Sequence, residues 1–367
     1  MRKFRRAFRR LPDPRSDNAR HNLLEILMIA LAASLCGATS CEEMAEFGRA
    51  KEGLLRGLLR LEHGIPSHDT FSRVFRLLEP NAFEMAFRRF MADFAKANKL
   101  KLGGVVALDG KALASAFERG QSTSPLHLVN VFAVEARMAL AQGKAPGRNE
   151  TAGALEVLQM LSLDGCIVTA DALHCHRAMA RAILARGGDY VLAIKGNRGP
   201  LFKAAQRQLQ RAGKRSSAKH ADPSTHGRHE RRRAVVMRNT SLATTHAFPG
   251  VVAVGRVTSY RRRHGQQADP VRVRHYLLST PLSAKRLLQI TRSHWTIENQ
   301  LHWVLDVQFG EDGNRARKDH APENLACLRR LALNILRAHP DRASIRRKIK
   351  RAGWNNAFLI DLLSHMR

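Results

Sequence analysis

The fold is decided by two short apolar stretches that each end in an aspartate, Val105-Val-Ala-Leu-Asp109-Gly and Cys166-Ile-Val-Thr-Ala-Asp171. Both are typical of buried β-strands, because apolar and β-branched residues follow one another without a charged residue. Residues 151–163, between them, have the apolar spacing of a helix, so the two strands can be parallel neighbours joined by a crossover helix. Ligands of open α/β sheets bind beyond the carboxyl ends of such strands. We therefore expect the carboxylates of Asp109 and Asp171 at strand ends beside one crevice.

The surrounding segments complete a mixed sheet. Residues 126–134 and 138–141 predict a hairpin, residues 174–186 a second helix, and residues 190–194 another strand. This order of elements predicts an α/β fold with a ribonuclease-H-like mixed-sheet catalytic core. Between about residues 201 and 279 the chain turns polar and basic with short strand patterns, which predicts a β-rich insertion. A long helix from about residue 283 to residue 308 should follow.

The ends of the chain are predicted to be helical. From residue 22 to residue 98 apolar residues recur at helical spacing, and Ser67 or Asp69 is expected to cap a helix there. The basic first fifteen residues look like a flexible arm that touches DNA. We interpret residues 1–100 as a helical, DNA-binding N-terminal region, 101–200 as the first part of the core, 201–280 as the insertion, and 281–367 as the helix that completes the core plus a basic helical segment.

The charge predicts a polyanionic partner. The 367 residues include 62 Lys and Arg against 31 Asp and Glu, a formal net charge of +31. An excess of this size favours nucleic acid over the alternative of a merely solvated basic surface.

Five scattered cysteines argue against a disulfide framework and favour a reducing cytoplasm. The longest apolar stretch, residues 26–38, is too short to cross a bilayer, so no membrane association is expected.

A third carboxylate is needed to complete a metal site. Asp109 and Asp171 facing one crevice would repel each other unless a proton or cation relieved them, and Mg²⁺ favours carboxylate oxygens. Taken singly, Asp109 is also explained by a turn and Asp171 by a helix N-cap. The candidate for the third carboxylate is Glu298, in Trp295-Thr-Ile-Glu-Asn. On its helix one stripe should hold His294, Glu298 and His302, beside a core-facing stripe of Ile297, Leu301 and Val304.

These residues carry a resemblance. The sequence resembles the insertion-sequence DDE transposases of the H-repeat-associated (ISAs) group over nearly the whole chain. The matching motifs are Val-Ala-Leu-Asp109-Gly-Lys, Leu126-His-Leu-Val, Ile167-Val-Thr-Ala-Asp171-Ala, Gly187-Gly-Asp-Tyr-Val-Leu-Ala-Ile-Lys-Gly-Asn197, Ser293-His-Trp-Thr-Ile-Glu298-Asn, the N-terminal Gly64-Ile-Pro-Ser-His-Asp-Thr-Phe71 and the distal Leu301-His-Trp-Val-Leu-Asp306-Val-Gln-Phe-Gly-Glu-Asp312.

The resemblance implies a catalytic and metal-binding triad of Asp109, Asp171 and Glu298. It also implies two Mg²⁺ ions (or Mn²⁺), cleavage at the ends of an element, and attack of the freed 3′-hydroxyl on target DNA. The partner would be double-stranded DNA, as terminal inverted repeats and as target, bound by a homodimer, with no small-molecule cofactor. The wider superfamily often has Tyr, Arg and Lys where this chain has Thr291, His294 and Leu305. Arg292, His294 and His302 are the nearest substitutes for these DNA contacts.

Several other basic residues are candidate DNA contacts. Lys111 and Lys195 follow strand ends, and two basic runs, residues 226–233 with Arg228, Arg231 and Arg232 and residues 261–264, are either exposed strand edges or contacts to the DNA backbone. Trp295 and Trp303 are expected to pack against the sheet rather than to stack on a base. His174 and His176 are expected at a helix start rather than around zinc.

Two alternatives to a transposase stay open at this level. A metal-dependent nuclease that only hydrolyses would need the same carboxylates. A catalytically inactive or repurposed element-derived protein would bind DNA without cutting it, although the intact Asp109, Asp171 and Glu298 count against that alternative.

Overall fold

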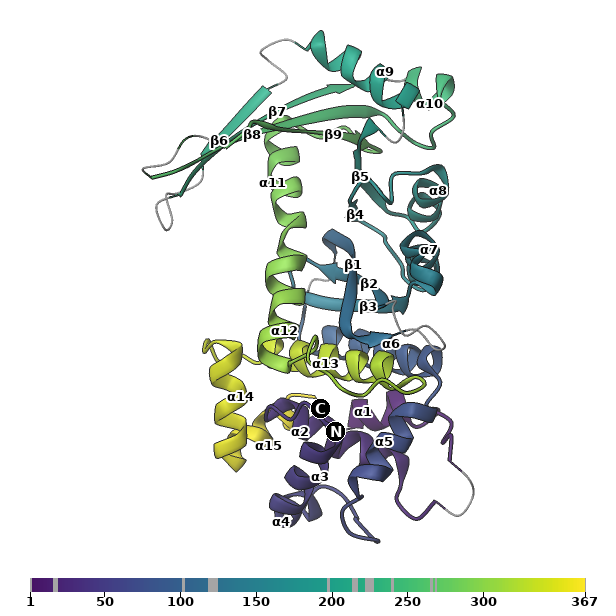
Figure 1. The fold of residues 1–367 in the computed structure, drawn as a ribbon, viewed down its shortest axis with the longest axis vertical. Coiled ribbons are helices and arrows are strands. Elements are labelled where there is room, and N and C mark those ends of the chain that lie inside the picture. Colours follow the sequence, from purple (N-terminus) through teal and green to yellow (C-terminus); the bar gives the residue numbers. More distant parts are fainter. Residues whose placement is uncertain are drawn as a thin grey trace.

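The computed structural model describes residues 2–15, 19–100, 103–117, 125–196, 199–212, 217–221, 228–238, 241–264, 267 and 269–366. One long sheet runs through the upper two thirds of the molecule, and a helical layer closes the lower end (Figure 1). Both chain termini lie in that helical layer.

The sheet has nine strands in the order β3-β2-β1-β4-β5-β9-β8-β7-β6. Its first five strands in the chain lie in ribonuclease-H-like order, in which β1 pairs antiparallel with β2 and parallel with β4, and β4 pairs parallel with β5. The strands are β1 (Gly104–Phe117), β2 (Pro125–Ala133), β3 (Met138–Lys144), β4 (Cys166–Ala170), β5 (Asp189–Ile194), β6 (Ser217–Ala221), β7 (Arg228–Arg238), β8 (Ala253–Arg263) and β9 (Arg272–Leu278).

The predicted hairpin and the three other predicted strands of the core are confirmed, but one expectation about β1 is wrong. Asp109 does not end its strand, because β1 continues to Phe117. Its parallel pairing with β4 reaches only Ala107↔Thr169, while its antiparallel pairing with β2 goes on past Asp109↔Asn130. A local apolar run cannot show this continuation, because backbone pairing with β2 extends the strand through polar residues.

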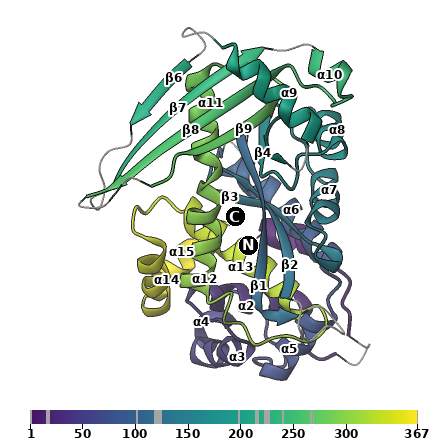
Figure 2. The same ribbon diagram turned by 45° about the horizontal axis from the view of Figure 1, so that its top comes forward.

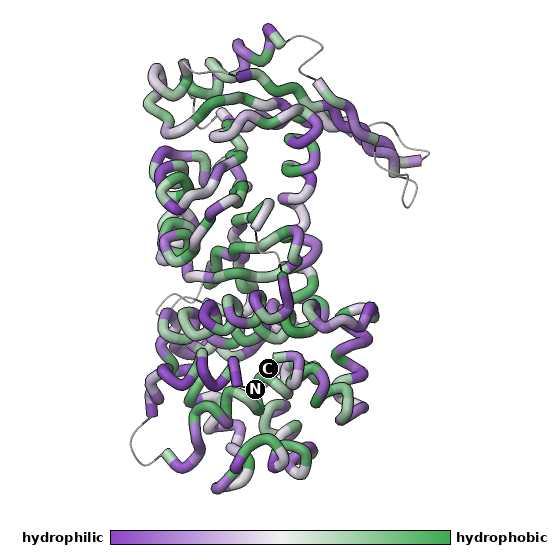
Figure 3. Tube along the Cα trace, turned by 180° about the vertical axis from the view of Figure 1, so that it is seen from behind, coloured by the Kyte–Doolittle hydropathy of each residue, from purple (hydrophilic) through white to green (hydrophobic). Residues whose placement is uncertain are grey.

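The predicted insertion strands continue the same sheet. β9 pairs antiparallel with β5, and β8, β7 and β6 follow outward. Their distal parts project from the body of the molecule as a ribbon (Figures 1 and 2). This projection is hydrophilic, as the purple colour of Figure 3 shows.

Helices cover both faces of the sheet. On one face α7 (Glu150–Gln159), α8 (Arg177–Ala185), α9 (Gly199–Gln210) and α10 (Ser241–Thr245) share an apolar core with the strands, to which Val106 and Leu108 of β1 contribute. A single turn of 3₁₀-helix, η1 (Pro146–Arg148), precedes α7. On the other face α11 (Ala284–His294) packs against Val105 and Val191.

The long helix predicted for residues 283–308 is present, with an interruption. α11 is followed by a π-helical segment, η4 (Ile297–His302), and by α12 (Trp303–Phe309). As predicted, Ile297, Leu301 and Val304 are buried in the core. The wider π-helical turn is of a kind often found at functional sites, and it carries Glu298.

The N-terminal and C-terminal segments form one helical layer under the sheet (Figure 1). The predicted cap is confirmed, since Ser67 accepts a hydrogen bond from the Thr70 amide at the start of α5. The helices are α1 (Arg2–Phe8), α2 (Leu23–Leu35), α3 (Cys41–Ala50), α4 (Glu52–Arg56), α5 (His68–Leu77), α6 (Pro80–Ala97), α13 (Ala321–Ala338), α14 (Ile345–Trp354) and α15 (Asn356–Ser364).

The prediction of a flexible N-terminal arm is wrong. Residues 2–8 form helix α1, and Phe4 and Phe8 are buried against Phe83 and Phe90 of α6. The many arginines make this segment look solvent-exposed in the sequence. Phe4 and Phe8, about one helical turn apart, nevertheless bury their rings, and the free energy of that burial decides where the segment lies. The five cysteines, all within the described residues, are thiols and form no disulfide with one another. No helix in the described ranges is both long and apolar enough to span a bilayer.

Candidate active site

Strand β1 aims Asp109 at the helix that carries Glu298. Successive side chains of a strand alternate between faces, and Val106 and Leu108 fill the α7 side, which leaves Asp109 on the α11 side. Its Oδ1 accepts a hydrogen bond from the Gly110 amide at 3.0 Å. Directly across the antiparallel pairing stands Asn130, so Asp109 and Asn130 lie next to each other on the same face.

Asp171 directly follows β4, as predicted. Its Oδ1 accepts from the Leu173 amide at 2.9 Å, and its side chain is exposed. His176 caps α8 by accepting from the Met179 amide, which confirms the helix-start interpretation of that histidine. Asp171 thus stands on a turn anchored at both ends by regular structure.

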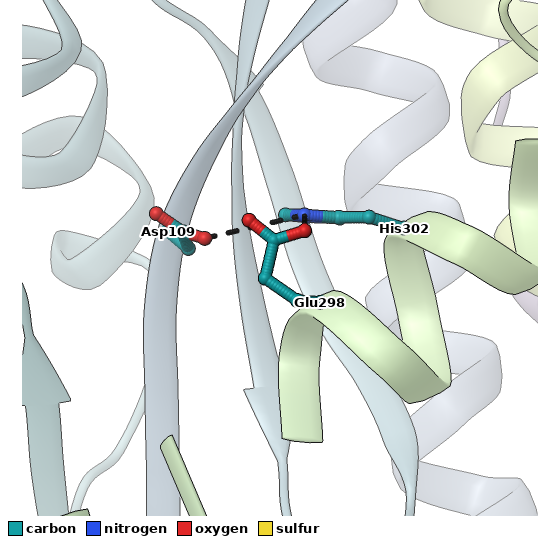
Figure 4. A group of neighbouring side chains, drawn as sticks. All are labelled: Asp109, Glu298 and His302. Carbon is teal, nitrogen blue, oxygen red and sulfur yellow. Dashed lines mark ion pairs between the residues drawn. The ribbon is translucent and has the colours of Figure 1, made fainter. Parts of the chain in front are cut away.

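Glu298 approaches Asp109 from η4, and His302, four residues further along the same segment, points its ring toward both carboxylates (Figure 4). His302 Nδ1 is 3.4 Å from Glu298 Oε2 and 4.0 Å from Asp109 Oδ2. His302 is buried, whereas half of the Glu298 side chain is exposed. The structure therefore brings one strand carboxylate and the helical carboxylate together.

One cavity of about 490 Å³ holds all three carboxylates. Asp109, Asp171 and Glu298 line it together with His294, Lys195 and Trp295. The tightest group of ligand atoms among the described residues consists of Asp109, Glu298 and His302, whose atoms lie within 4.8 Å of one another. Asp171 also lines the cavity, but its carboxylate is not part of this group of neighbouring ligand atoms.

The electrostatics of the cavity reflect the crowded carboxylates. Burial raises the pKa of Asp109 to about 8, and the negative charges of Glu298 and Asp171 add to the increase. The hydrogen bond from His302 lowers the pKa of Glu298. Burial lowers the pKa of His294 to about 4, so this ring is neutral at physiological pH. Asp109 keeps a proton at neutral pH because burial and the negative charge of Glu298 both disfavour its ionised form.

The donor set fits a hard divalent cation. Carboxylate oxygens are the ligands that Mg²⁺ prefers, and a cation between Asp109 and Glu298 would replace the proton that the raised pKa of Asp109 reveals. Glu298 and Asp171 are solvent-exposed, so water and a phosphate group have access to the same oxygens.

The structure gives Lys111 a setting that does not favour the predicted DNA contact. Lys111 is buried, and its Nζ lies 2.7 Å from Asp306 Oδ1 and 3.1 Å from Asp312 Oδ1. Burial lowers the pKa of Lys111, but the bonds to Asp306 and Asp312 outweigh it and raise the pKa overall. Its ammonium group is therefore engaged inside the protein.

The other predicted DNA contacts are distributed along the cavity and the ribbon. Lys195 is exposed at the end of β5, Arg231 is exposed on β7, and Arg232 is half-buried beside Glu230 at 2.9 Å. Arg292 Nη1 lies 2.8 Å from His220 Nε2, and His294 Nδ1 lies 3.0 Å from Thr169 Oγ1. Arg228 belongs to β7, but its side chain lies outside the described residues.

The two tryptophans of the helix are both exposed, and of the two Trp295 contacts strand β9 of the sheet. Trp295 and Trp303 are 46% and 57% exposed. Arg274 lies over the Trp295 ring, 4.9 Å from its centroid.

Sequence reasoning missed the buried polar residues behind the site. Asn130 and Arg330 are fully buried and hydrogen-bonded to each other, and Arg330 also pairs with buried Glu311. Asn130 and Arg330 are polar residues in largely apolar segments of the sequence, and that pattern could have marked them, whereas Glu311 lies in a polar segment.

Two family models match the chain. Residues 5–91 match the DDE_Tnp_1-associated model, and residues 101–335, which carry all three cavity carboxylates, match the Transposase DDE domain. The chain belongs to this DDE transposase family. A transposase acts on DNA, which accounts for the strongly positive net charge.

Named relatives of this transposase extend over nearly its full length. It is 30% identical to the putative transposase YncI of Escherichia coli O157:H7, over 96% of this chain and 92% of that protein. It is also 30% identical to the H repeat-associated putative transposase YhhI of Escherichia coli K12, over 96% of each chain. A cryo-EM structure of the piggyBac transposase synaptic complex with hairpin DNA is a more distant match, with a TM-score of 0.44 and 11% identity over 98% of this chain and 77% of that chain.

Proposed function

We propose that this transposase cuts DNA phosphodiesters at the ends of an insertion sequence and joins the freed 3′-hydroxyl to target DNA. Asp109, Asp171 and Glu298 are the proposed catalytic and metal-binding residues. The observation that carries the proposal is their convergence in one cavity from β1, the turn after β4, and η4.

The proposed reaction depends mainly on the charge of the bound metal and on the positions of the carboxylates that hold it. Bound Mg²⁺, or Mn²⁺ in its place, supplies a Lewis acid for attack at phosphorus, and two ions are expected by the logic of in-line displacement. Asp109 and Glu298 lie together where a cation would bind, while Asp171 lines the same cavity from the turn after β4. Asp109 must lose its proton before it can act as a ligand.

A basic groove beside the cavity gives the DNA a route. A second hollow shares Arg274, Tyr276, Thr291 and Trp295 with the carboxylate cavity and continues along the ribbon. Arg232, Arg261 and Arg272 line this continuation. We place the DNA backbone along this groove, with Lys195 at its catalytic end, because arginine and lysine neutralise phosphates and set the register of the duplex.

The proposed partners are the terminal repeats of the element and a target duplex. Two ends must be cut and joined together, so a homodimer on DNA is part of the proposal. The helical region of residues 1–100 is its proposed accessory DNA-binding segment.

The test uses purified protein, Mg²⁺ and labelled duplexes that carry the two DNA ends flanking the coding sequence. We expect wild-type protein to nick the ends and to join them to a plasmid, and Asp109→Asn, Asp171→Asn and Glu298→Gln each to reduce cleavage at least 100-fold. Glu156→Gln, an exposed carboxylate change on α7, is the control and should cleave normally. Cleavage by all three cavity variants at the wild-type rate would refute the assignment.

The same assay separates the alternatives. A nuclease would cut the ends without producing joined molecules. A repurposed DNA-binding protein would retain the ends in a mobility-shift gel and leave them uncut in Mg²⁺ and in Mn²⁺.

A further inference from the structure

A row of polar contacts leads from α13 to the cavity. Arg330 Nε donates to Asn130 Oδ1 at 2.7 Å, Asn130 Nδ2 lies 3.4 Å from His302 Nε2, and the other ring nitrogen of His302 lies 3.4 Å from Glu298 Oε2. The first three residues of this row are buried. Figure 4 shows its last step, in which the His302 ring points at the facing carboxylates of Glu298 and Asp109.

Arg330 fixes the orientation of the Asn130 amide. Its guanidinium is fully buried and is held by Glu311 Oε1 at 2.7 Å and by the Ala326 carbonyl at 2.8 Å. A guanidinium has only donors. The Asn130 group facing it must therefore be the carbonyl oxygen, which directs the NH₂ group toward His302.

The Asn130 amide in turn fixes where the imidazole carries its proton. An NH₂ group can bond only to an unprotonated ring nitrogen, so His302 Nε2 is the acceptor. A neutral imidazole then has its hydrogen on Nδ1, the nitrogen that faces Glu298 and Asp109.

We infer that His302 is a positioning residue that donates from Nδ1 to Glu298, and that it is not a metal ligand. This inference rests on the proposed function for the meaning of Glu298, but the direction of the hydrogen bonds stands on contacts within the protein. It differs from the grouping by distance alone, in which His302 is a possible third ligand. It also replaces the DNA contact predicted for His302, because the buried ring is engaged on both nitrogens.

The function of the row is to hold Glu298 in place for the cation. Glu298 is half exposed on a π-helical turn, so without a partner its side chain would sample many rotamers. Groups that orient a metal ligand commonly contribute about 10–100-fold to metal affinity. Because His302 supplies a hydrogen and no lone pair, the cation keeps an all-oxygen shell, which suits Mg²⁺ better than a softer metal.

The first experiment determines which ring nitrogen of His302 carries the proton. Full-length protein is labelled with ¹⁵N-histidine, and long-range ¹H–¹⁵N spectra are recorded without metal and with Mg²⁺, the His302 signals being identified by their loss in His302→Gln. We expect a protonated Nδ1 and an unprotonated Nε2 in both samples. An Nδ1 without a proton, or one that loses its proton when Mg²⁺ is added, would overturn the inference.

A second variant tests the link through Asn130. Asn130→Asp presents acceptors to both Arg330 and His302, so Nε2 should gain a proton. The control is Asn334→Asp, which places the same charge at another buried amide, one that bonds to the Ala139 backbone on β3. An unchanged His302 spectrum in folded Asn130→Asp, or the same change in the control, would contradict the proposed row.

A third experiment measures the affinity for Mg²⁺ and does not depend on DNA cleavage. In calorimetric titrations with Mg²⁺, His302→Leu should bind about 10–100-fold more weakly, whereas His302→Asn, whose NH₂ group can replace the Nδ1 donor, should recover much of that loss. Equal losses in the two folded variants would favour a ligand role instead. Wild-type protein with the expected ring proton but without cleavage would reject the proposed function and leave the hydrogen-bond direction intact.

Discussion

Lys111 and Asp306 form an ion pair between Nζ and Oδ1 at 2.7 Å, and this pair joins strand β1 to helix α12. The two residues flank the site, since Lys111 is two residues from Asp109 and α12 follows directly on η4. The pair therefore fixes the separation of the elements that carry Asp109 and Glu298.

Asp306→Asn should destabilise the fold by about 1–3 kcal/mol, because it leaves the buried Lys111 ammonium with a weaker partner. Asp93→Asn, which breaks the more exposed pair with Arg6, is the control and should cost less than about 1 kcal/mol. Urea unfolding measures both. A loss in Asp306→Asn no larger than in the control would show that the pair does not join the two elements.

Mg²⁺ binding should release a proton. The pKa of Asp109 is about 8, so at lower pH the metal must displace a proton from this group. The apparent affinity should fall as pH decreases below about 8, by up to about tenfold for each pH unit, and should level off above it. Calorimetry in buffers with different ionisation enthalpies counts the protons. Asp109→Asn should remove the proton release, and release that persists in this variant would point to another group.

The buried carboxyl of Glu84 should make stability fall with increasing pH. Burial raises the pKa of Glu84 to about 7, so the folded state holds a proton that the unfolded state has already lost, and stability decreases as pH rises toward and through about 7. Glu84→Gln keeps a carbonyl acceptor for the Gln142 amide and has no charge to bury. Relative to wild type, it should gain up to about 3 kcal/mol between about pH 5 and pH 8.

The pH series is measured by urea unfolding, with the exposed change Glu46→Gln as control. The difference between Glu84→Gln and wild type should grow with pH, while the control difference stays flat. A pH-independent difference for Glu84→Gln would show that Glu84 ionises normally in the folded protein.

The exposed arginines of the ribbon should contribute to DNA affinity through salt-dependent contacts. Arg231→Ala should weaken binding of all duplexes to a similar extent and reduce the slope of log K against log salt by about 0.9, the value for one lost phosphate contact. Arg211→Ala, an exposed arginine just after α9, is the matched control and should leave the slope unchanged. Fluorescence anisotropy at several salt concentrations gives both slopes, and equal slopes for wild type and Arg231→Ala would exclude a phosphate contact.

The elements of the core were readable from the sequence because their patterns are local. The hairpin of β2 and β3, the strands at Val105 and Ile167, and the capped helix at Ser67 each depend on residues within a few positions of one another. Family motifs added what periodicity alone cannot give, namely that Glu298 belongs with Asp109. Helical spacing predicted only that Glu298 shares a stripe with His302.

The sequence by itself thus determined the order of the elements and the charge that suits a DNA partner, and its family motifs singled out the three acidic residues that line the cavity. Only the tertiary structure decided that β1 runs on past Asp109, that the first arginine-rich segment packs into the core, and that Lys111 faces Asp306 rather than solvent. It also decided the row from Arg330 through Asn130 to His302. The reason is physical: burial and hydrogen-bond direction depend on groups far apart along the chain, and no local pattern encodes which of them meet.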